Sequence, residues 1–409
     1  MLGLYCYTIM KTKTSFKFLL FFFGLKLTFC EAQTAADTVQ PRVLKGLSFT
    51  QDSTLLVNFH FRIQSRFGYI SQSLQSVAPG NFDLGVRRAR LFFDGHVYSK
   101  KLTYLLQINF SKRDLDEDNT EVNHILRDAM IWYEAWKGMK IGIGQGKLPG
   151  NRQRITSSGN LEFTDRSIVS LAYHLDRDAG LFANQSLKLG KVGVNFKTAI
   201  TSGEGRNAGV SDKGLATTGR LEILPFGSFT NGNDMSEADI EVEKSPKLCI
   251  AAVAHYNDLA KKTMGQTGAF MSTPRYLHAY MMDLLFKYYG FALSSEYLYR
   301  GVNNPFNDFN RLGYYVAGDG LNTQMSYCFE NNTNVAFRYA ITRPNDKLAT
   351  LAPHQKQYGI CVSKFINHHK IKLQTEIQFN ELSYRINGKL INQNIRQYMA
   401  GFLQVELGI

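Results

Sequence analysis

Between residues 371 and 381 the chain alternates apolar and polar side chains almost without a break, as Ile-Lys-Leu-Gln-Thr-Glu-Ile-Gln-Phe-Asn-Glu. Successive side chains of an extended strand point to opposite faces. A period of two therefore predicts a strand with an apolar medium on one side and water on the other. Repeated along a chain, this pattern is typical of a transmembrane β-barrel with lipid outside and water inside. The apolar face carries Ile371, Leu373, Ile377 and Phe379, and the polar face carries Lys372, Gln374, Glu376, Gln378 and Asn380.

The same alternation divides most of the chain into antiparallel strands, roughly sixteen to eighteen in number. Stretches rich in Gly, Asn, Asp and Pro separate them, as turns and loops require. No internal domain boundary is visible. The predicted strands are 56–67, 87–95, 102–110, 126–136, 139–145, 180–189, 192–201, 219–225, 246–256, 277–289, 291–300, 311–317, 322–330, 333–342, 357–365, 370–382 and 395–409.

The composition favours one large all-β domain over a helical membrane protein. Beyond the N-terminus there is no run of about eighteen apolar residues, the length that a membrane-crossing helix needs. Phe (29) and Tyr (21) are abundant strand formers, whereas Pro is rare (9). The formal net charge is +13, so small anions are the natural partners.

The first 32 residues resemble a secretion signal. Lys11, Lys13 and Lys17 precede an apolar stretch at 18–29, and small residues follow near Ala32. We therefore predict a Sec-type signal peptide over 1–32 and a single barrel domain over 33–409. Removal of the signal would take away four lysines and one glutamate, leaving 13 − 3 = +10. A lipoprotein signal ending at Cys30 is the weaker interpretation, because bulky Phe29 precedes this cysteine.

Three cysteines follow the leader, at positions 249, 328 and 361. Their number is odd and all lie in predicted strands, so we expect buried or lipid-facing thiols rather than a disulfide framework. The last predicted strand, 395–409, runs to the end of the sequence. This position suits a final strand that closes the sheet and leaves no edge, and it implies folding by the outer-membrane barrel assembly machinery.

One stretch, residues 146–165, breaks the rhythm. It holds three Gly, one Pro and Ser157-Ser158, and it shows no sustained alternation. Long loops without secondary structure of their own are usually functional when they are ordered. We therefore expect this loop to have a role in whatever passes through the barrel.

Several motifs in sequence order resemble one family. They are Val86-Arg87-Arg88-Ala89-Arg90-Leu91, the run 126–133 beginning Leu-Arg-Asp-Ala, the run 141–149 reading Ile-Gly-Ile-Gly-Gln-Gly-Lys-Leu-Pro, Asp165-Arg166, and Arg177-Asp178-Ala179-Gly180. Their order and spacing resemble the phosphate-selective porins O and P, most densely over 56–256. The resemblance implies a sixteen-stranded barrel in the outer membrane of a Gram-negative bacterium, usually a homotrimer.

The resemblance also implies that the third external loop folds inward as a constriction, and it places that loop at 147–166. Members of the family that select phosphate line a narrow pore with basic residues. In the matching segments of this chain those residues are Arg88, Arg90, Lys147, Arg152, Arg154 and Arg166. Many relatives resemble general porins, so the resemblance is compatible with both a general pore and a phosphate-selective pore.

Independently of any family, charge placement predicts a basic lumen. A charged side chain facing lipid costs about 2–4 kcal/mol near the bilayer centre, so cations within amphipathic strands should face water. Rings of Arg and Lys favour anions, and Arg can grip phosphate through two hydrogen bonds. The competing interpretation is that these cations pair with lumenal carboxylates or with lipopolysaccharide at the rim. The cations on polar strand faces are Arg62, Arg88, Arg90, Arg338 and Lys372.

Other function classes find little support. Residues 142–147 lack the spacing of a phosphate-cradling loop, and His368 and His369 would point to opposite faces of a strand. No Gly-x-Ser-x-Gly elbow occurs, so we predict no enzyme. The histidines and cysteines show no metal-binding spacing, and we predict no metal and no cofactor. The alternative is a soluble, secreted, basic all-β protein that binds glycan or nucleic acid. A signal peptide and apolar strand faces along the whole chain argue against it, and we expect no nucleic-acid partner.

Overall fold

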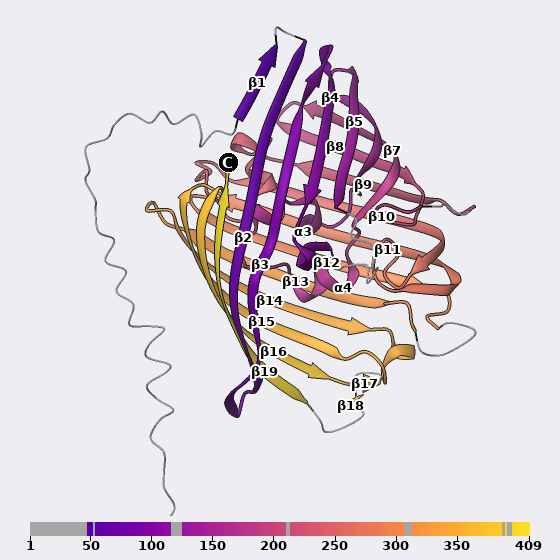
Figure 1. The fold of residues 1–409 in the computed structure, drawn as a ribbon, viewed down its shortest axis with the longest axis vertical. Helices are drawn as coiled ribbons and strands as arrows, with labels where there is room; N and C mark the ends of the chain where they lie inside the picture. The colour runs from indigo at the N-terminus through magenta and orange to yellow at the C-terminus, as the bar shows by residue number, and fades with distance from the viewer. Residues whose placement is uncertain are drawn as a thin grey trace, which may run out of the picture.

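The wall of the molecule is one antiparallel sheet that closes on itself (Figure 1). The computed structural model describes residues 47–51, 54–115, 125–209, 213–306, 313–386, 389–390 and 395–409. Sixteen strands form the barrel in chain order, and β19 closes it by pairing with β2, as Leu403↔Phe67 and Glu406↔Gln64 show. The predicted barrel of about sixteen strands is confirmed. The predicted signal peptide lies outside the described residues.

The strands of the first half are β2 (Leu55–Ser73), β3 (Ser76–Val97), β4 (Ser99–Asn109), β5 (Leu126–Trp136), β6 (Met139–Lys147), β7 (Arg177–Leu189), β8 (Val192–Thr201) and β9 (Ala216–Leu224). Those of the second half are β10 (Lys247–Lys262), β11 (Phe270–Tyr288), β12 (Phe291–Val302), β13 (Gly318–Cys328), β14 (Thr333–Pro344), β15 (His354–Asn367), β16 (Ile371–Ser383) and β19 (Arg396–Gly408). A short strand, β1 (Leu47–Gln51), pairs with the start of β2, beyond the end of β19. A small hairpin joins β17 (Arg385–Ile386) to β18 (Lys389–Leu390).

Apolar side chains face outward and polar side chains face inward, the reverse of a soluble protein. In β15, Ile360 and Val362 are 47% and 44% exposed, whereas Cys361 between them is fully buried. The buried side chains of β16 and β19 include Gln374 and Glu406. A barrel in lipid needs this arrangement, because the hydrocarbon faces its outer surface.

One strand prediction was wrong, and two other predicted strands were too short. Residues 313–317 form no strand, although 311–317 reads as one. Tyr315 there is buried in a connection, and its hydroxyl donates to the backbone oxygens of Ala260 and Thr273. Conversely, β2 and β3 extend through 68–86, where glycines and register shifts hide the alternation.

The two ends of the barrel differ in their connections. At one end most turns are short, such as 137–138 and 289–290, where Gly138 and Gly290 adopt positive φ. The exception at this end is residues 225–246, between β9 and β10, here named the inward segment. It contains the 3-10 turn η4 (Thr230–Met235).

At the other end, residues 148–176 between β6 and β7 form the inward loop. It contains α3 (Arg152–Ile155), η3 (Ser158–Asn160) and α4 (Ile168–Tyr173), and α3 and α4 are drawn within the ring of strands in Figure 1. Two further short elements lie in connections at this end, α2 (Lys112–Leu115) and η5 (Asp346–Leu348). No helix in the described part of the chain is long and apolar enough to cross a membrane.

Candidate pore constriction

The inward loop lies against the barrel wall through an apolar underside. Val169 and Tyr173 of α4, with Leu148 and Leu175, are buried in one cluster with wall residues from several strands. Apolar contacts inside a polar lumen fix the loop in place because they remove it from water. The predicted inward-folded loop is therefore present, although it runs ten residues past the predicted end at Arg166, to residue 176.

Carboxylates of the wall and of the inward segment hold backbone N–H groups of the loop. Gln153 donates its backbone N–H to Glu296 at 3.2 Å, and Glu162 donates its own to Glu237 at 2.9 Å. Thr164 donates both its backbone N–H and its hydroxyl to Glu376, at 2.8 and 2.6 Å. These charge-assisted bonds are stronger than neutral ones, so they fix the course of the loop.

Cations of the wall hold the loop's carbonyl oxygens in the same way. The Lys372 Nζ lies 2.8 Å from the oxygen of Gly159 and 2.9 Å from that of Leu161. Lys147 donates to Ile155 at 2.9 Å, and Arg338 donates to Asp165 at 3.1 Å while its guanidinium stacks over Phe163. Three residues predicted to face passing anions therefore bind the loop backbone.

Asp165 of the loop gathers three guanidinium groups from β2 and β3. Arg66, Arg87 and Arg88 lie 3.3, 3.0 and 2.9 Å from its carboxylate. Burial alone would raise the pKa of Asp165, but the three positive charges outweigh it and hold that pKa well below 3.8. Arg88, a predicted pore residue, is therefore bound to the loop through Asp165.

The loop's own arginines are also paired. Arg152 lies 2.7 Å from Asp283 of β11, and Arg154 lies 2.8 Å from Asp176. Arg166 donates to the backbone oxygens of Gln153 and Thr156, at 2.7 and 3.2 Å. Of these three arginines, only Arg166 lines a cavity beside the loop.

That cavity, of about 330 Å³, lies between the loop and the wall strands β3 to β7. Five cationic side chains and one carboxylate line it, together with Phe92, Trp132 and Phe182. We name it the basic cavity. Its charged lining residues are Arg90, Arg127, Lys147, Arg166, Arg177 and Asp128.

Of the nine predicted pore cations, Arg90, Lys147 and Arg166 meet in the basic cavity, and Arg62 lines a second cavity. The other five, namely Arg88, Arg152, Arg154, Arg338 and Lys372, line neither.

Arg127 and Arg177 are members of the cavity that sequence reasoning missed. A register shift between β4 and β5 pairs Gln107 with Asp128 and Ile108 with Leu126, so Arg127 is an extra residue. Such a bulge lets both Arg127 and Asp128 be buried, which simple alternation cannot predict. Arg177, the first residue of β7, holds Asp128 through two bonds of 2.9 Å. Both arginines stood within the motifs that carried the family resemblance.

The inward segment meets the inward loop inside the barrel. Asn160 of the loop donates its side-chain amide to Met235 at 2.9 Å and accepts the backbone N–H of Glu237 at 3.1 Å. The Lys287 Nζ of β11 binds the segment through the backbone oxygens of Asn233, Ser236 and Ala238 and the side-chain oxygen of Asn233, at 2.7–3.1 Å. The lumen is therefore narrowed from both ends.

Three thiols lie in the wall strands, and Arg152 of the inward loop donates to one of them, Cys249, at 3.1 Å. Cys249, Cys328 and Cys361 are free and buried, so the expectation of buried thiols holds. Within the described residues, no three His, Cys, Asp or Glu side chains are grouped to hold a metal ion.

A closed sixteen-stranded barrel, apolar outside and polar inside, with a loop folded into its lumen, defines an outer-membrane porin. The sequence profile of the family described as phosphate-selective porin O and P matches residues 57–331, more than half of the chain. The chain belongs to the phosphate-selective porin O and P family.

Solved porin structures share this fold at very low sequence identity. OprB from Pseudomonas putida is 9% identical with a TM-score of 0.53, over 88% of this chain and 95% of that one. The anion-selective porin from Comamonas acidovorans is 9% identical with a TM-score of 0.53, over 86% and 99%. Salmonella typhi OmpF in complex with daunomycin is 8% identical with a TM-score of 0.53, over 88% and 100%. No curated protein sequence matches the chain.

The protein is therefore an outer-membrane channel of a Gram-negative bacterium, through which small solutes diffuse passively. The alternative of a soluble secreted binding protein is set aside by the family membership and by the apolar outer face. Family and fold point to a channel rather than an enzyme.

Proposed function

We propose that the channel prefers anions and that the basic cavity sets this preference. The observation that carries the proposal is its lining of five cations and one carboxylate. In a narrow, water-filled passage with low-dielectric walls, such an excess of positive charge concentrates anions and repels cations.

The ion pairs within the cavity reduce this charge without cancelling it. Arg90 binds Asp114 of α2 through two bonds, of 2.6 and 2.7 Å, and Arg127 lies 3.3 Å from the same carboxylate. Arg177 is paired with Asp128. Asp176 also lies 3.3 Å from Arg177. Counting Asp114, Asp128 and Asp176 against the five cations leaves 5 − 3 = +2. The sum, rather than any single free side chain, would act on a passing ion.

Reversal potential measures the preference directly. The full chain is reconstituted in a planar bilayer with a potassium chloride gradient, and the sign of the zero-current potential identifies the more permeant ion. We expect chloride. Arg127→Ala should move the permeability ratio toward unity, because it removes a cavity cation while Arg90 still binds Asp114.

The matched control is Lys197→Ala. Lys197 also pairs with a buried carboxylate, Glu222 at 2.9 Å, but it does not line the basic cavity. Cation preference of the wild type would refute the proposal. Equal shifts in both variants would place the selectivity elsewhere in the lumen.

Phosphate is the finer part of this proposal. The family's description names phosphate, and the guanidinium groups of the cavity offer the paired donors that phosphate oxygens accept. Phosphate added to one side should reduce chloride current at lower concentration than sulfate does. Equal effects of the two anions would indicate a general anion pore.

Assembly follows the family expectation. We propose a homotrimer, in contact with outer-membrane lipid and lipopolysaccharide and inserted by the barrel assembly machinery. Cross-linking in native membranes, read on a gel, would count the subunits.

A further inference from the structure

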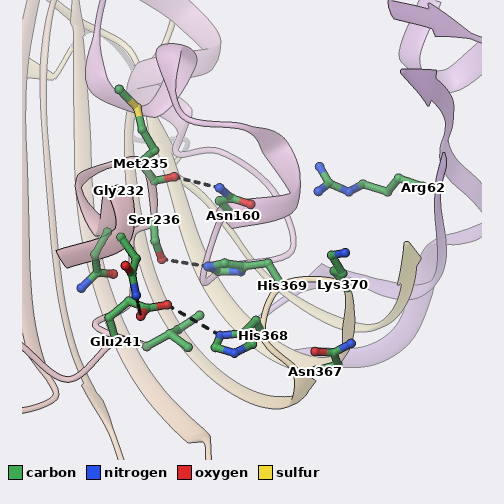
Figure 2. A pocket seen from close by; sticks show the side chains of 13 residues that line it. Arg62, Asn160, Gly232, Met235, Ser236, Glu241, Asn367, His368, His369 and Lys370 are labelled. Carbon is green, nitrogen blue, oxygen red and sulfur yellow. Dashed lines mark hydrogen bonds and ion pairs between the residues drawn. The ribbon is translucent and has the colours of Figure 1, made fainter. Parts of the chain in front are cut away.

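A second cavity, of about 420 Å³, lies where the inward segment, the turn between β15 and β16 and the tip of the inward loop meet (Figure 2). Its size is within the range of ligand pockets, about 300–1,000 Å³. We name it the turn cavity. Its lining includes Arg62, Asn160, Ser236, Glu241, His369 and Lys370.

The cationic side of the turn cavity is formed by Arg62 of β2 and Lys370 of the turn. In Figure 2 the Arg62 side chain extends from its strand toward Asn160. Its Nε lies 2.8 Å from Glu406 and its Nη1 donates to Ser157 at 2.9 Å. A Cβ at Gly159 would lie 2.0 Å from the Arg62 Cζ, so glycine is needed there for this placement.

The two cavities are neighbours along the inward loop. Ser157, which binds Arg62, lines the basic cavity, and Asn160 lines the turn cavity. The two cavities are therefore linked through the Arg62–Ser157 hydrogen bond.

The opposite side of the turn cavity presents acceptors. The Ser236 hydroxyl has a single hydrogen, and it donates this hydrogen to the backbone oxygen of Ala238 at 2.8 Å. The His369 Nε2, 2.8 Å from the same hydroxyl, must then be the donor, which leaves Nδ1 as an acceptor. Among the described residues this Nδ1 has no hydrogen-bond partner. An unpaired buried acceptor costs free energy, so a donor from a ligand would relieve it.

Asn160 and Glu241 extend this acceptor side. Asn160 uses its amide nitrogen for Met235, and its oxygen points to the side of Arg62 in Figure 2. Glu241 accepts from Asn231 at 2.8 Å and lies 3.8 Å from His368.

The charge around His369 selects among possible donors. Burial first, and then the positive charges of Lys372, Arg62 and Lys287, lower the pKa of His369 well below 6.5. The imidazole is therefore neutral, and the surrounding positive potential disfavours an ammonium group. A hydroxyl group has the required hydrogen without the charge.

We propose that the turn cavity binds a small organic anion that carries hydroxyl groups, such as a sugar acid. Its acid group lies between Arg62 and Lys370, and its hydroxyls donate to His369 and Asn160. This inference rests on the proposed anion preference and names a solute class for it.

Block of chloride current tests the proposal with three six-carbon probes. Gluconate has the acid and the hydroxyls, hexanoate has only the acid, and sorbitol has only hydroxyls. We expect gluconate to reduce the current of the reconstituted full chain at the lowest concentration. Inorganic phosphate and serine are added as further probes. Each should reduce the current only at a higher concentration than gluconate does.

Two variants place the block in the turn cavity. Arg62→Met should weaken gluconate block about tenfold, the factor that corresponds to 1.4 kcal/mol. In His369→Phe, the concentration of gluconate needed for block should rise toward that of hexanoate, because the variant lacks the acceptor but keeps the cations. The matched control is His354→Phe, at the opposite end of β15, which should leave the block unchanged.

Each contrary outcome is decisive. Equal block by hexanoate, or by sorbitol, would reduce the site to a plain anion site or a plain polyol site and overturn the proposal. Stronger block by serine or phosphate would assign another solute class. A folded barrel migrates faster on a gel before boiling than after it. If Arg62→Met lacks this fast-migrating form, the proposal is still tested by His369→Phe with its control His354→Phe, and by the order in which the probes block the wild type. Anion selectivity is read separately from the reversal potential, so it can stand while this proposal falls.

Discussion

The inward loop and the inward segment both narrow the lumen, but they are held in different ways. The loop is anchored at many points by the wall, with carboxylates such as Glu376 on its N–H groups and cations such as Lys372 on its carbonyl oxygens. The segment is held largely by its own carboxylates, since Asp239 and Glu243 bind Asn233 within it. Its main anchor on the wall strands is Lys287, with four acceptors.

Charge inside this barrel serves largely to hold connecting segments in place. Most lumenal cations near the loop make structural bonds, so their presence in a strand does not by itself mark an ion pathway. Many equivalent anchors tolerate the loss of one member better than a region that depends mainly on one anchor. The comparison therefore predicts unequal effects for equal substitutions.

Lys287→Met should have the largest effect. It removes one buried cation and one donor from three backbone oxygens of the segment. Ala238 keeps the Ser236 hydroxyl and Asn233 keeps the Ser236 N–H, so the cost falls mainly on the Ser236 oxygen, at about 1–3 kcal/mol for a buried acceptor left unpaired. A folded barrel migrates faster on an unboiled gel than the unfolded chain. We expect half of this fast-migrating band to be lost at a lower urea concentration than in the wild type. We also expect larger single-channel conductance, because the segment would leave the lumen.

Lys247→Met is the control for this substitution. Lys247 pairs directly across from Lys287 on β10 and makes an exposed bond of 3.3 Å to Phe226. Its loss should change neither measurement appreciably. Similar losses in the two variants would contradict the interpretation of Lys287 as the main anchor of the segment.

Lys372→Met should have a smaller effect on the loop. It removes the donor to the backbone oxygens of Gly159 and Leu161. Gln374 still contacts the Leu161 oxygen at 3.5 Å. The carboxylate of Glu406 still has a cationic partner, Arg62, at 2.8 Å. We expect a cost at the lower end of about 1–3 kcal/mol and noisier open-channel current.

Lys356→Met, on the same hairpin, removes only a half-exposed pair with Glu381 at 3.2 Å and serves as the control. A conductance increase in Lys372→Met as large as in Lys287→Met would remove the contrast between the two regions.

The wall of the barrel could be predicted from sequence because alternation reports directly on which face meets lipid. Prediction from alternation failed where an apolar residue is buried in a connection, as at Tyr315. It also failed where a bulge breaks the period of two, as at Arg127. The inward segment gave no signal, since its buried groups are mostly polar and pair with each other. Glu237 and Asp239 are buried there, yet their sequence reads as an ordinary turn.

The site was predicted in part for a similar reason. The sequence predicted Arg90, Lys147 and Arg166 as pore-lining cations, and all three line the basic cavity. It could not tell them from Arg88 and Lys372, because which cation binds a carbonyl oxygen depends on the course of the loop. That course is set by long-range partners such as Glu296 and Glu376.

The smallest expected effect concerns pH at the contact between the two regions. Burial, and then the charge of Glu237, raise the pKa of Glu162 to about 6 from 4.5. The ionised carboxylate therefore costs stability above pH 6, and this cost disappears as the pH falls through 6 toward 4.5. Asp165 has the opposite shift, to well below 3.8, so the stability it contributes is retained at pH 5. The loop should be held more firmly at pH 5 than at pH 7.5.

Open-channel current noise measures this directly. We expect less noise at pH 5 in the wild type and a smaller change in Glu162→Gln, whose amide is uncharged at both values and can still accept from Gln324 and Asn334. Noise that grows on acidification in the wild type would mean that another group releases the loop. In that case the Glu162–Glu237 contact would not be the titrating link between the inward loop and the inward segment.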